Sequence, residues 1–503
     1  MSITIGIDFG TTKSIVGAWV DGKPFIIPCS NGRLSIPSEI LVQGQGSLQE
    51  IFVGWDTRKK NKYSKDSFLV NAIKRNAGKS NYSKEKWWYV YPQYTISYIL
   101  AELKCMAEEF FNQDITDAVI AIPSHFDLNQ RRAIREAGVI AGLNVIRLLN
   151  EASASAMLYS IQYPEEQVLM VIDIGGGTTD IALLEVNNNI LDVLNIEGNT
   201  NIGGIDYNNV LHRWFLEQLN NSFDIRDSEI NKTTEQIIKD EIERMKIELS
   251  ENKSSSIYLP WLSINGQFLH KEFVLTQADF KKLSVKVTNE ISKLIIKTLA
   301  SCNRKIDACL FLGGASNTYG LKEKVFLTTD NLPVPRRIEK TSVAKGAIIQ
   351  AAIFNKEIQG LILDCLQASY GIGLQNDTYD ILLNKNETIP VTKIKEFSTS
   401  EDNQTEIIVK LYKGENKIAS KNKYIGNLSL KKLPPLPKGT LVINVKIEVN
   451  ANMDFSITAE IKGRSDLNVE TSLKSEFGLP HDLILDMQKK IELWKSKRKL
   501  QLS

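Results

Sequence analysis

The chain has 503 residues, too many for a single hydrophobic core, so two or more domains are expected. Apolar residues make up 43% of it and charged residues 24%, which is the composition of an ordinary globular protein. A net charge of +2 argues against a dedicated nucleic-acid or membrane surface. We find no charged-then-apolar leader and no long apolar run, and the five cysteines are scattered, as free thiols of a reducing compartment would be. These features predict a cytosolic protein.

Residues 1 to about 358 alternate strands and helices. Asp21-Gly22 lies between two apolar runs and predicts an early hairpin. The predicted strands lie at residues 2–8, 14–20, 24–27, 117–123, 145–149, 168–174, 180–186 and 308–312. The predicted helices lie at residues 129–141, 152–159, 205–219, 234–249, 276–299 and 342–354. The helices at 234–249 and 276–299 are both expected to be long and amphipathic.

The pattern changes at about residue 365, and apolar and polar residues then alternate as far as about residue 465. Ile443, Val445, Ile447 and Val449 face one way, while the residues between them are polar. This period of two predicts a half-buried antiparallel sheet, and its extent favours an all-β sandwich.

A short helix is predicted from Pro480 to about residue 494, because proline suits a first helical position. Leu483, Met487, Ile491 and Trp494 form one apolar stripe, which we expect to brace the sandwich. The basic residues 495–499 that follow are interpreted as a solvated tail and not as a binding patch.

One internal repeat carries functional information. Residues 6–19 (GIDFGTTKSIVGAW) and 171–184 (VIDIGGGTTDIALL) share a strand that ends in aspartate, a Gly-Thr turn and a returning strand. Glycine lets backbone N–H groups approach a phosphate, and threonine hydroxyls add donors. Two such turns could clamp a polyphosphate while the aspartates hold the water shell of Mg²⁺. Either turn alone could be only a hairpin, and neither is a P-loop or a dinucleotide fingerprint.

Along nearly its whole length the sequence resembles the 70-kDa heat-shock chaperone family. The matching segments include GIDFGTTKS, NAIKRNAGKS, TDAVIAIPSHFDLNQRRAIREAGVIAGLNVIRLLNEASASAM, VIDIGGGTTDIALLEV, GNTNIGGIDYNN, IERMKIELSEN, ACLFLGGASN, VAKGAIIQAAI, LILD and ETIPVTKIKEFSTSEDNQTEIIVKLYKGE. Sugar kinases and actins share the paired turns but lack the last two segments. The resemblance implies a duplicated ribonuclease-H-like (actin-like) α/β ATPase domain, an all-β sandwich that binds peptides and a short C-terminal helix.

The resemblance also implies roles for individual residues of the ATPase domain. Its catalytic residues would be Lys74, Glu151, Asp173 and Thr178, and Asp8 and Asp173 would hold the metal through water. Its nucleotide-binding residues would be Asp8, Gly10, Thr11, Thr12, Gly175, Gly176, Gly177, Asp180, Gly203, Gly204, Glu243, Lys246, Ser250, Gly313 and Gly314. The residues alone also allow interpretations without a functional role. Lys74 could be a surface lysine, and Glu243, Lys246 and Ser250 could form one face of a salt-bridged surface helix.

For the second domain the resemblance implies an apolar peptide pocket and a coupling path to the ATPase. The pocket residues would be Ile372, Gln375, Phe397, Ser400, Ile407 and Val409, and the coupling residues Pro123, Arg131, Arg147, Asn150, Leu361, Leu363 and Asp364. Gln375 and Ser400 stand where bacterial members place Met and Ala over the bound peptide. The linker Leu361–Asp364 is apolar, so it should dock in at least one state. The long helical lid of the family is reduced to about 20 residues.

The predicted organisation is an ATPase domain (1–358), an apolar linker (359–366), a β-sandwich (367–468) and a remnant lid helix with a basic tail (469–503). The predicted function is an ATP-dependent molecular chaperone for extended apolar segments of client proteins, with ATP/ADP, Mg²⁺ and K⁺ as cofactors. A J-domain co-chaperone and a nucleotide exchange factor are the implied partners, with no nucleic acid and no membrane. A dedicated assembly factor for one partner remains the alternative, and a phosphotransferase or an actin-like filament protein is a more distant one.

Overall fold

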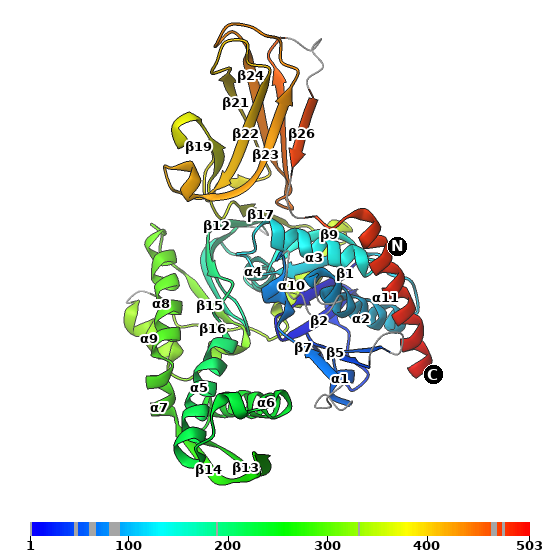
Figure 1. The fold of residues 1–503 in the computed structure, drawn as a ribbon, viewed down its shortest axis with the longest axis vertical. Helices are drawn as coiled ribbons and strands as arrows, with labels where there is room; N and C mark the ends of the chain where they lie inside the picture. Colours follow the sequence, from blue (N-terminus) through cyan, green and yellow to red (C-terminus); the bar gives the residue numbers. More distant parts are fainter. Residues whose placement is uncertain are drawn as a thin grey trace.

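The computed structural model describes residues 3–44, 49–59, 67–79, 91–187, 190–329, 332–463, 470–474 and 478–502. Two lobes, each built on a mixed sheet, form the body of the molecule, and a domain of strands projects from one end (Figure 1). None of the described helices is both long enough and apolar enough to cross a membrane.

The first lobe is built on a sheet of order β3-β2-β1-β8-β9, with β4 paired to β2. Its strands are β1 (Ile5–Phe9), β2 (Lys13–Val20), β3 (Lys23–Ile26), β4 (Ile36–Pro37), β8 (Asp117–Ile122) and β9 (Asn144–Asn150). Helices α2 (Pro92–Phe111) and α3 (Leu128–Ile140) share its core. A small sheet of order β6-β5-β7 adjoins them, built from β5 (Ile40–Gln43), β6 (Glu50–Val53) and β7 (Ser67–Val70), with α1 (Asp56–Lys59) beside it.

The second lobe repeats this arrangement. Its sheet has the order β16-β15-β10-β11-β12-β17-β20, so the run β12-β11-β10-β15-β16 follows the same connectivity as the first sheet. In both sheets the first strand pairs antiparallel with the second and parallel with a later one. The strands are β10 (Gln167–Ile174), β11 (Thr179–Asn187), β12 (Ile190–Asn199), β15 (Ala308–Leu312), β16 (Arg336–Arg337), β17 (Leu361–Cys365) and β20 (Thr388–Ile389). The internal repeat of the sequence is thus a repeat of topology.

Helices α4 (Glu151–Gln162) and α10 (Ser342–Phe354) pack between the two sheets. Close approach here needs glycine: a Cβ on Gly6 would lie 2.4 Å from the backbone nitrogen of Ile348. The outer part of the second lobe holds α5 (Gly204–Phe223), α6 (Lys232–Leu249), α9 (Leu321–Thr328) and the hairpin β13 (Ser254–Ile264) with β14 (Gln267–Thr276).

The single long helix predicted at 276–299 is wrong. The structure has α7 (Gln277–Leu283) and α8 (Val285–Ala300), separated at Ser284. Ser284 has φ −89° and ψ 2°, outside the helical range, and its hydroxyl donates to Phe280 O at 2.7 Å. A serine hydroxyl that bonds back to the carbonyl four residues earlier weakens and bends a helix, and the helix is interrupted at this residue.

The projecting β-domain consists of two sheets around one core. One sheet has the order β19-β18-β22-β23-β26, and the other β21-β24-β25. Its strands are β18 (Tyr370–Gly373), β19 (Tyr379–Leu383), β21 (Val391–Ser398), β22 (Glu406–Lys413), β23 (Lys423–Lys431), β24 (Val442–Val449), β25 (Phe455–Ile461) and β26 (Glu470–Lys474). The predicted alternation is confirmed, since Ile443, Val445, Ile447 and Val449 are each 1% exposed. Because β26 pairs with β23, strand pairing continues beyond residue 468.

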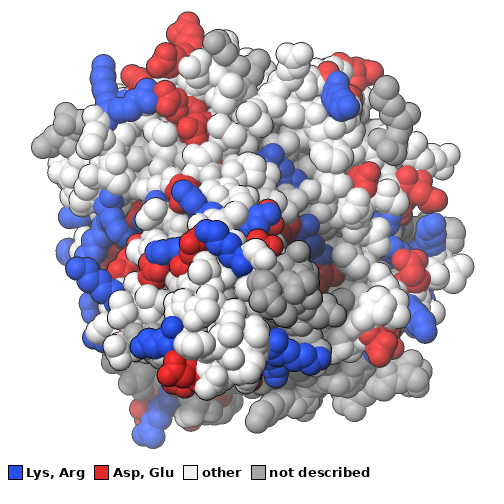
Figure 2. Space-filling model, turned by 90° about the horizontal axis from the view of Figure 1, so that it is seen from above, with Lys and Arg blue, Asp and Glu red and all other residues white. Residues whose placement is uncertain are grey.

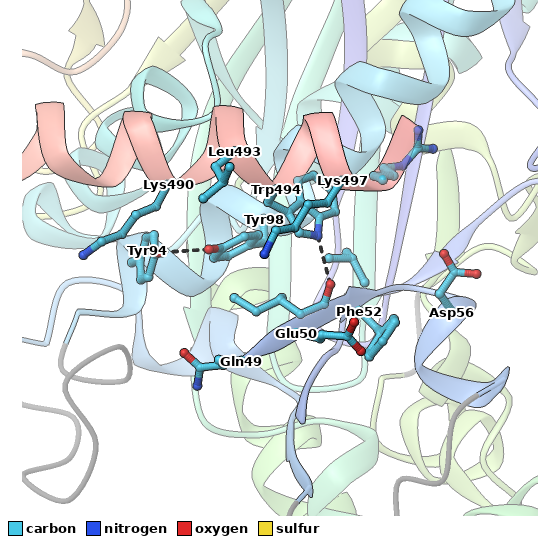
Figure 3. Close-up of a pocket in the computed structure, with 13 residues that line it drawn as sticks. Gln49, Glu50, Phe52, Asp56, Tyr94, Tyr98, Lys490, Leu493, Trp494 and Lys497 are labelled. Carbon is cyan, nitrogen blue, oxygen red and sulfur yellow. Dashed lines mark hydrogen bonds between the residues drawn. The ribbon is translucent and has the colours of Figure 1, made fainter. Parts of the chain in front are cut away.

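The last helix, α11 (His481–Leu502), does not brace the β-domain, and that prediction is wrong. It lies along α2 and α3 of the first lobe (Figure 1), with Met487 and Ile491 buried in that lobe's core. Trp494 Nε1 donates to Ile51 O at 2.9 Å. A cavity of about 220 Å³ remains between α11, α2 and β6 (Figure 3). The stripe correctly indicated a buried face but gave no information on its partner.

The basic residues after Trp494 are not simply a solvated tail, because they continue the same helix. Lys495 Nζ donates to Ala141 O at 3.2 Å. Arg498 donates to both carboxylate oxygens of Glu102, at 2.6 and 2.9 Å, and also pairs with Glu109. These bonds fix the end of α11 to α2 and the turn after α3.

Candidate functional site

The two Gly-Thr turns of the internal repeat lie against each other, one from each lobe. A Cβ on Gly176 would lie 2.6 Å from Cγ2 of Thr12, and one on Gly177 would lie 2.6 Å from Cγ2 of Thr11. Any larger side chain would therefore push the turns apart. The second turn closes on itself through a 2.9 Å bond from Gly175 N–H to Thr178 O.

Two further glycine turns of the second lobe adjoin this contact. Gly204 N–H donates to Gly175 O at 2.9 Å, so the start of α5 is bonded to the second Gly-Thr turn. Gly313 ends β15 with φ +76°, a conformation that favours glycine. A Cβ there would lie 2.6 Å from the Asp173 carboxylate. The predicted turn residues Gly175–Gly177, Gly203, Gly204 and Gly313 are thus brought together.

Lys74 is not a surface lysine. It lies on a short 3₁₀ helix (Ile73–Asn76), is 2% exposed, and donates through Nζ to Glu151 Oε1 at 2.5 Å. Its ammonium also lies 5.6 Å from the ring centre of Phe9 and 5.8 Å from that of Phe126. A buried, paired lysine has a defined position, which is what a charge-stabilising catalytic group needs.

Carboxylates are concentrated around that lysine. Burial raises the pKa of Asp8 to about 7 and the pKa of Asp180 to about 8; the Glu151 carboxylate adds to both shifts and Lys74 opposes them. The pKa of Asp173 is also raised well above its ordinary value, by burial and by its neighbouring carboxylates. So many buried acids beside one lysine make the site short of positive charge.

One helical face was predicted to reach the same site, and only part of it does. Lys246 Nζ donates to Gly204 O at 3.2 Å, and burial lowers the pKa of Lys246. Ser250 Oγ donates to Lys246 O at 3.2 Å, within its own helix. Glu243 is exposed. A Cβ on Gly314 would meet no atom of the described residues within 4 Å, so this turn is not covered by the described part of the chain.

Two residues that join the lobes here, Arg75 and Asp206, were not among the predicted site residues. Arg75, next to Lys74, donates through Nε to Gly177 O at 2.9 Å and through Nη2 to Asp206 Oδ2 at 2.6 Å. The same oxygen of Asp206 accepts from Gly203 N–H at 2.8 Å. A basic residue beside a predicted catalytic lysine was the available signal, but its partner lies 131 positions away.

Most of the predicted coupling residues form a buried network at the base of the β-domain. Arg131 donates to Asn150 Oδ1 at 2.6 Å, and Asn150 donates to Asp364 Oδ1 at 2.6 Å. Arg147 lies 4.0 Å from the other oxygen of Asp364 and donates to Ile362 O at 3.4 Å. Pro123 comes before these residues in the sequence, and its carbonyl accepts a hydrogen bond from the N–H of Phe126.

Comparisons with known proteins identify the family of the chain. The model of the family described as Hsp70 protein matches residues 81–502. The chaperone protein DnaK of Ureaplasma urealyticum is 32% identical over 507 residues, covering 98% of this chain and 82% of that protein. The chaperone protein DnaK of Metamycoplasma hominis is 32% identical over 465 residues, covering 91% and 77%.

The chain belongs to the Hsp70 family. Members of this family are ATPases, and this chain is an ATP-dependent molecular chaperone whose enzymatic activity is ATP hydrolysis. The resemblance noted in the sequence is confirmed.

In this Hsp70 the predicted linker is docked as strand β17 on the second sheet. It pairs in parallel with β12, aligning Ile190 with Leu361 and Asp192 with Leu363. The burial is uneven: Ile362 is 3% exposed, whereas Leu361 is 47% exposed. Through β20, the same strand also pairs with the β-domain. β17 thus belongs to both parts of the molecule.

The residues predicted to line the peptide pocket differ in burial. Ile372 and Val409 are 2% and 8% exposed, while Phe397 and Ile407 are half-buried against the same core. Ser400 is half-buried, and its N–H donates to Gln404 Oε1 at 3.0 Å. The side chain of Gln375 lies outside the described part of the structure.

The outer face of the β-domain carries charges of both signs. Lys395 pairs with Asp380, and Lys462 with Glu396. Figure 2, seen from above, shows basic and acidic side chains interspersed across this face. Such a mixture does not create the single-sign field that attracts nucleic acid.

Proposed function

We propose that ATP binds with Mg²⁺ where the two Gly-Thr turns of a duplicated ribonuclease-H-like fold meet and is hydrolysed slowly beside Lys74. The observation that carries the proposal is the convergence of both repeat turns, the buried Lys74–Glu151 pair and three acids at one place. The shared strand order of the two sheets supports the duplication.

The acids fit a hard cation. Asp8 and Asp173 supply oxygen ligands, their burial disfavours charge, and Lys74 alone does not balance them. Among the described residues, no three His, Cys, Asp or Glu side chains lie close enough to hold a metal ion directly. We therefore assign Asp8 and Asp173 to a Mg²⁺ ion held through its water shell. The bound ion would polarise the phosphates; K⁺ is proposed as a second cation from the resemblance alone.

Each protein group then has a defined task. Glu151 holds the Lys74 ammonium, which is placed to stabilise charge on the γ-phosphate and on the attacking water. The Thr11, Thr12 and Thr178 hydroxyls and the glycine N–H groups bind phosphate oxygens. Asp180 accepts from His125 N–H at 2.9 Å, which fixes its carboxylate beside the site. Lys246 and the turn at Gly313-Gly314 are proposed to contact the adenosine and α-phosphate.

We propose further that the state of the nucleotide controls client exchange in the β-domain, which binds extended apolar peptide segments. The Arg131–Asn150–Asp364 network is the proposed path, since it begins beside the nucleotide lobes and ends on β17. A J-domain co-chaperone and a nucleotide exchange factor are proposed as partners from the resemblance. The cytosolic location stays a prediction of the sequence.

The experiment is peptide release. Because α11 packs on the first lobe and not over the β-domain, a fluorescent apolar peptide should dissociate from the ADP form nearly as fast as from the ATP form. Ser400 and Gln375 in place of Ala and Met also remove apolar cover. Slow release in ADP alone would mean that another element or a partner covers the peptide, and would contradict this account of the cycle.

One observation favours the alternative of a dedicated assembly factor. The Ser400–Gln404 bond makes the rim of the predicted pocket polar, as a site for a folded surface would be. Purification from native lysate separates the two, because a dedicated factor should retain one stoichiometric partner and a general chaperone many clients.

A further inference from the structure

Directly beside Lys74 lies a contact between the two lobes that the proposed chemistry does not use. It spans the proposed nucleotide site between the lobes, which we call the nucleotide cleft. Arg75 is on the first lobe, and both of its bonds reach the second lobe, to Gly177 O at 2.9 Å and to Asp206 Oδ2 at 2.6 Å. Its side chain is 17% exposed and that of Asp206 is 23% exposed, so the pair is largely shielded from water.

The partners of Arg75 are parts of the phosphate turns themselves. Gly177 belongs to the second Gly-Thr turn, and Asp206 holds Gly203 N–H at 2.8 Å at the start of α5. There is no room for a larger group at this contact, because a Cβ on Gly177 would lie 2.7 Å from Arg75 Nε. One guanidinium therefore fixes two turns of the opposite lobe at once, which its planar, multiple-donor geometry allows and an ammonium does not.

The segment that carries Lys74 also shows backbone strain. Ala72, immediately before the 3₁₀ helix, has φ 50° and ψ 26°, the left-handed region that alanine disfavours. Such a conformation persists only where its surroundings impose it. The bonds of Lys74 to Glu151 and of Arg75 to the second lobe are the surroundings that hold this segment.

We propose that Arg75 is a positioning residue that clamps the nucleotide cleft shut and thereby places Lys74 for hydrolysis. Its two bonds join the lysine's segment to the turn that would hold the phosphates. Opening the cleft must break both of its bonds, so Arg75 should slow the release of ADP. The inference rests on the proposed nucleotide site.

The test is the release of a fluorescent ADP analogue from the full chain after a chase with excess ATP. Losing bonds to a charged group should accelerate release by about ten- to a hundredfold in Arg75→Ala. Arg75→Lys keeps the charge but cannot make both bonds, so it should fall between the wild type and Arg75→Ala. Lys79→Ala is the matched control, since among the described residues Lys79 donates within its own segment, to Asn76 Oδ1, and release should stay at the wild-type rate.

A second readout separates a clamp from a general structural role. Because the pair is only partly exposed, added salt should speed wild-type release modestly, and release from Arg75→Ala should respond less to salt. Asp206→Asn should reproduce the faster release, and adding it to Arg75→Ala should have little further effect. Wild-type-like release from both Arg75 variants would overturn the clamp, whereas failure of the wild type to bind the ADP analogue would overturn the proposed nucleotide site.

Discussion

The packing of α11 on the first lobe leads to a prediction that separates that lobe from the β-domain. Ile491 is fully buried in the first lobe's core. Removing a buried Ile side chain to Ala costs about 2–5 kcal/mol, from lost burial and from the cavity left behind. Leu493 on the same helix is 59% exposed, so Leu493→Ala should change stability by about 0.5 kcal/mol or less.

Calorimetry with and without ADP can assign the effect to one part of the molecule. A ligand stabilises only the state that binds it, so the unfolding transition whose midpoint temperature rises with ADP belongs to the lobes that bind the nucleotide. Ile491→Ala should lower the midpoint of that transition, and Leu493→Ala should not. If Ile491→Ala shifted only the transition that ADP leaves unchanged, α11 would belong to the β-domain and the reasoning would be refuted.

The pair of Arg498 with Glu102 should make the stability contributed by α11 depend on pH. Burial raises the pKa of Glu102 even though Arg498 opposes the shift. Breaking a buried pair by removing one partner costs about 3–5 kcal/mol when the other stays charged. In Arg498→Ala the remaining carboxyl can escape that cost by taking up a proton. The variant should therefore lose more stability at pH 8 than at pH 5, and an equal loss at both would contradict a charged, buried Glu102.

Three further predictions concern the cleft and the linker. Lys74→Ala should keep ATP binding but slow single-turnover hydrolysis by about 10²–10³, and unchanged turnover would remove Lys74 from the catalytic set. Partial proteolysis near Asp364 should be slower with ATP than with ADP if docking of β17 follows the nucleotide, and equal rates would mean uncoupled domains. Burial lowers the pKa of His125 from 6.5 to about 4, so between pH 6.5 and pH 4 the unfolded chain binds more protons than the folded one, and stability falls as the pH drops through this range. The urea midpoint of His125→Gln should therefore fall less steeply with pH than that of the wild type. Equal slopes for the two proteins would mean that His125 does not cause the loss of stability.

The elements that were predicted well are those with local signals. The strands of the repeat, the Gly-Thr turns and the alternation in β24 each depend on residues within a few positions of one another. The role of Lys74 came from the resemblance, and its burial and its pairing with Glu151 are facts of the tertiary structure.

What the sequence could not supply is which distant surfaces meet. The stripe of α11 required a buried face, but the β-domain and the first lobe were equally able to provide one. Arg75 and Asp206 each look like ordinary surface charges, because nothing local marks residues that pair across a cleft. The break at Ser284 is a local event, yet apolar periodicity continues across it and hides it.

The β-domain is attached to both lobes at once, and this follows from its two ends. At its start, β17 is a strand of the second sheet through its pairing with β12. At its end, α11 is fixed to the first lobe by Ile491, Trp494 and Arg498. A rotation of one lobe against the other, about an axis that passes through neither attachment, changes the distance between them. The β-domain must then either move or become strained, so a clamp that controls the cleft, as proposed for Arg75, also acts on the domain that is proposed to bind the client.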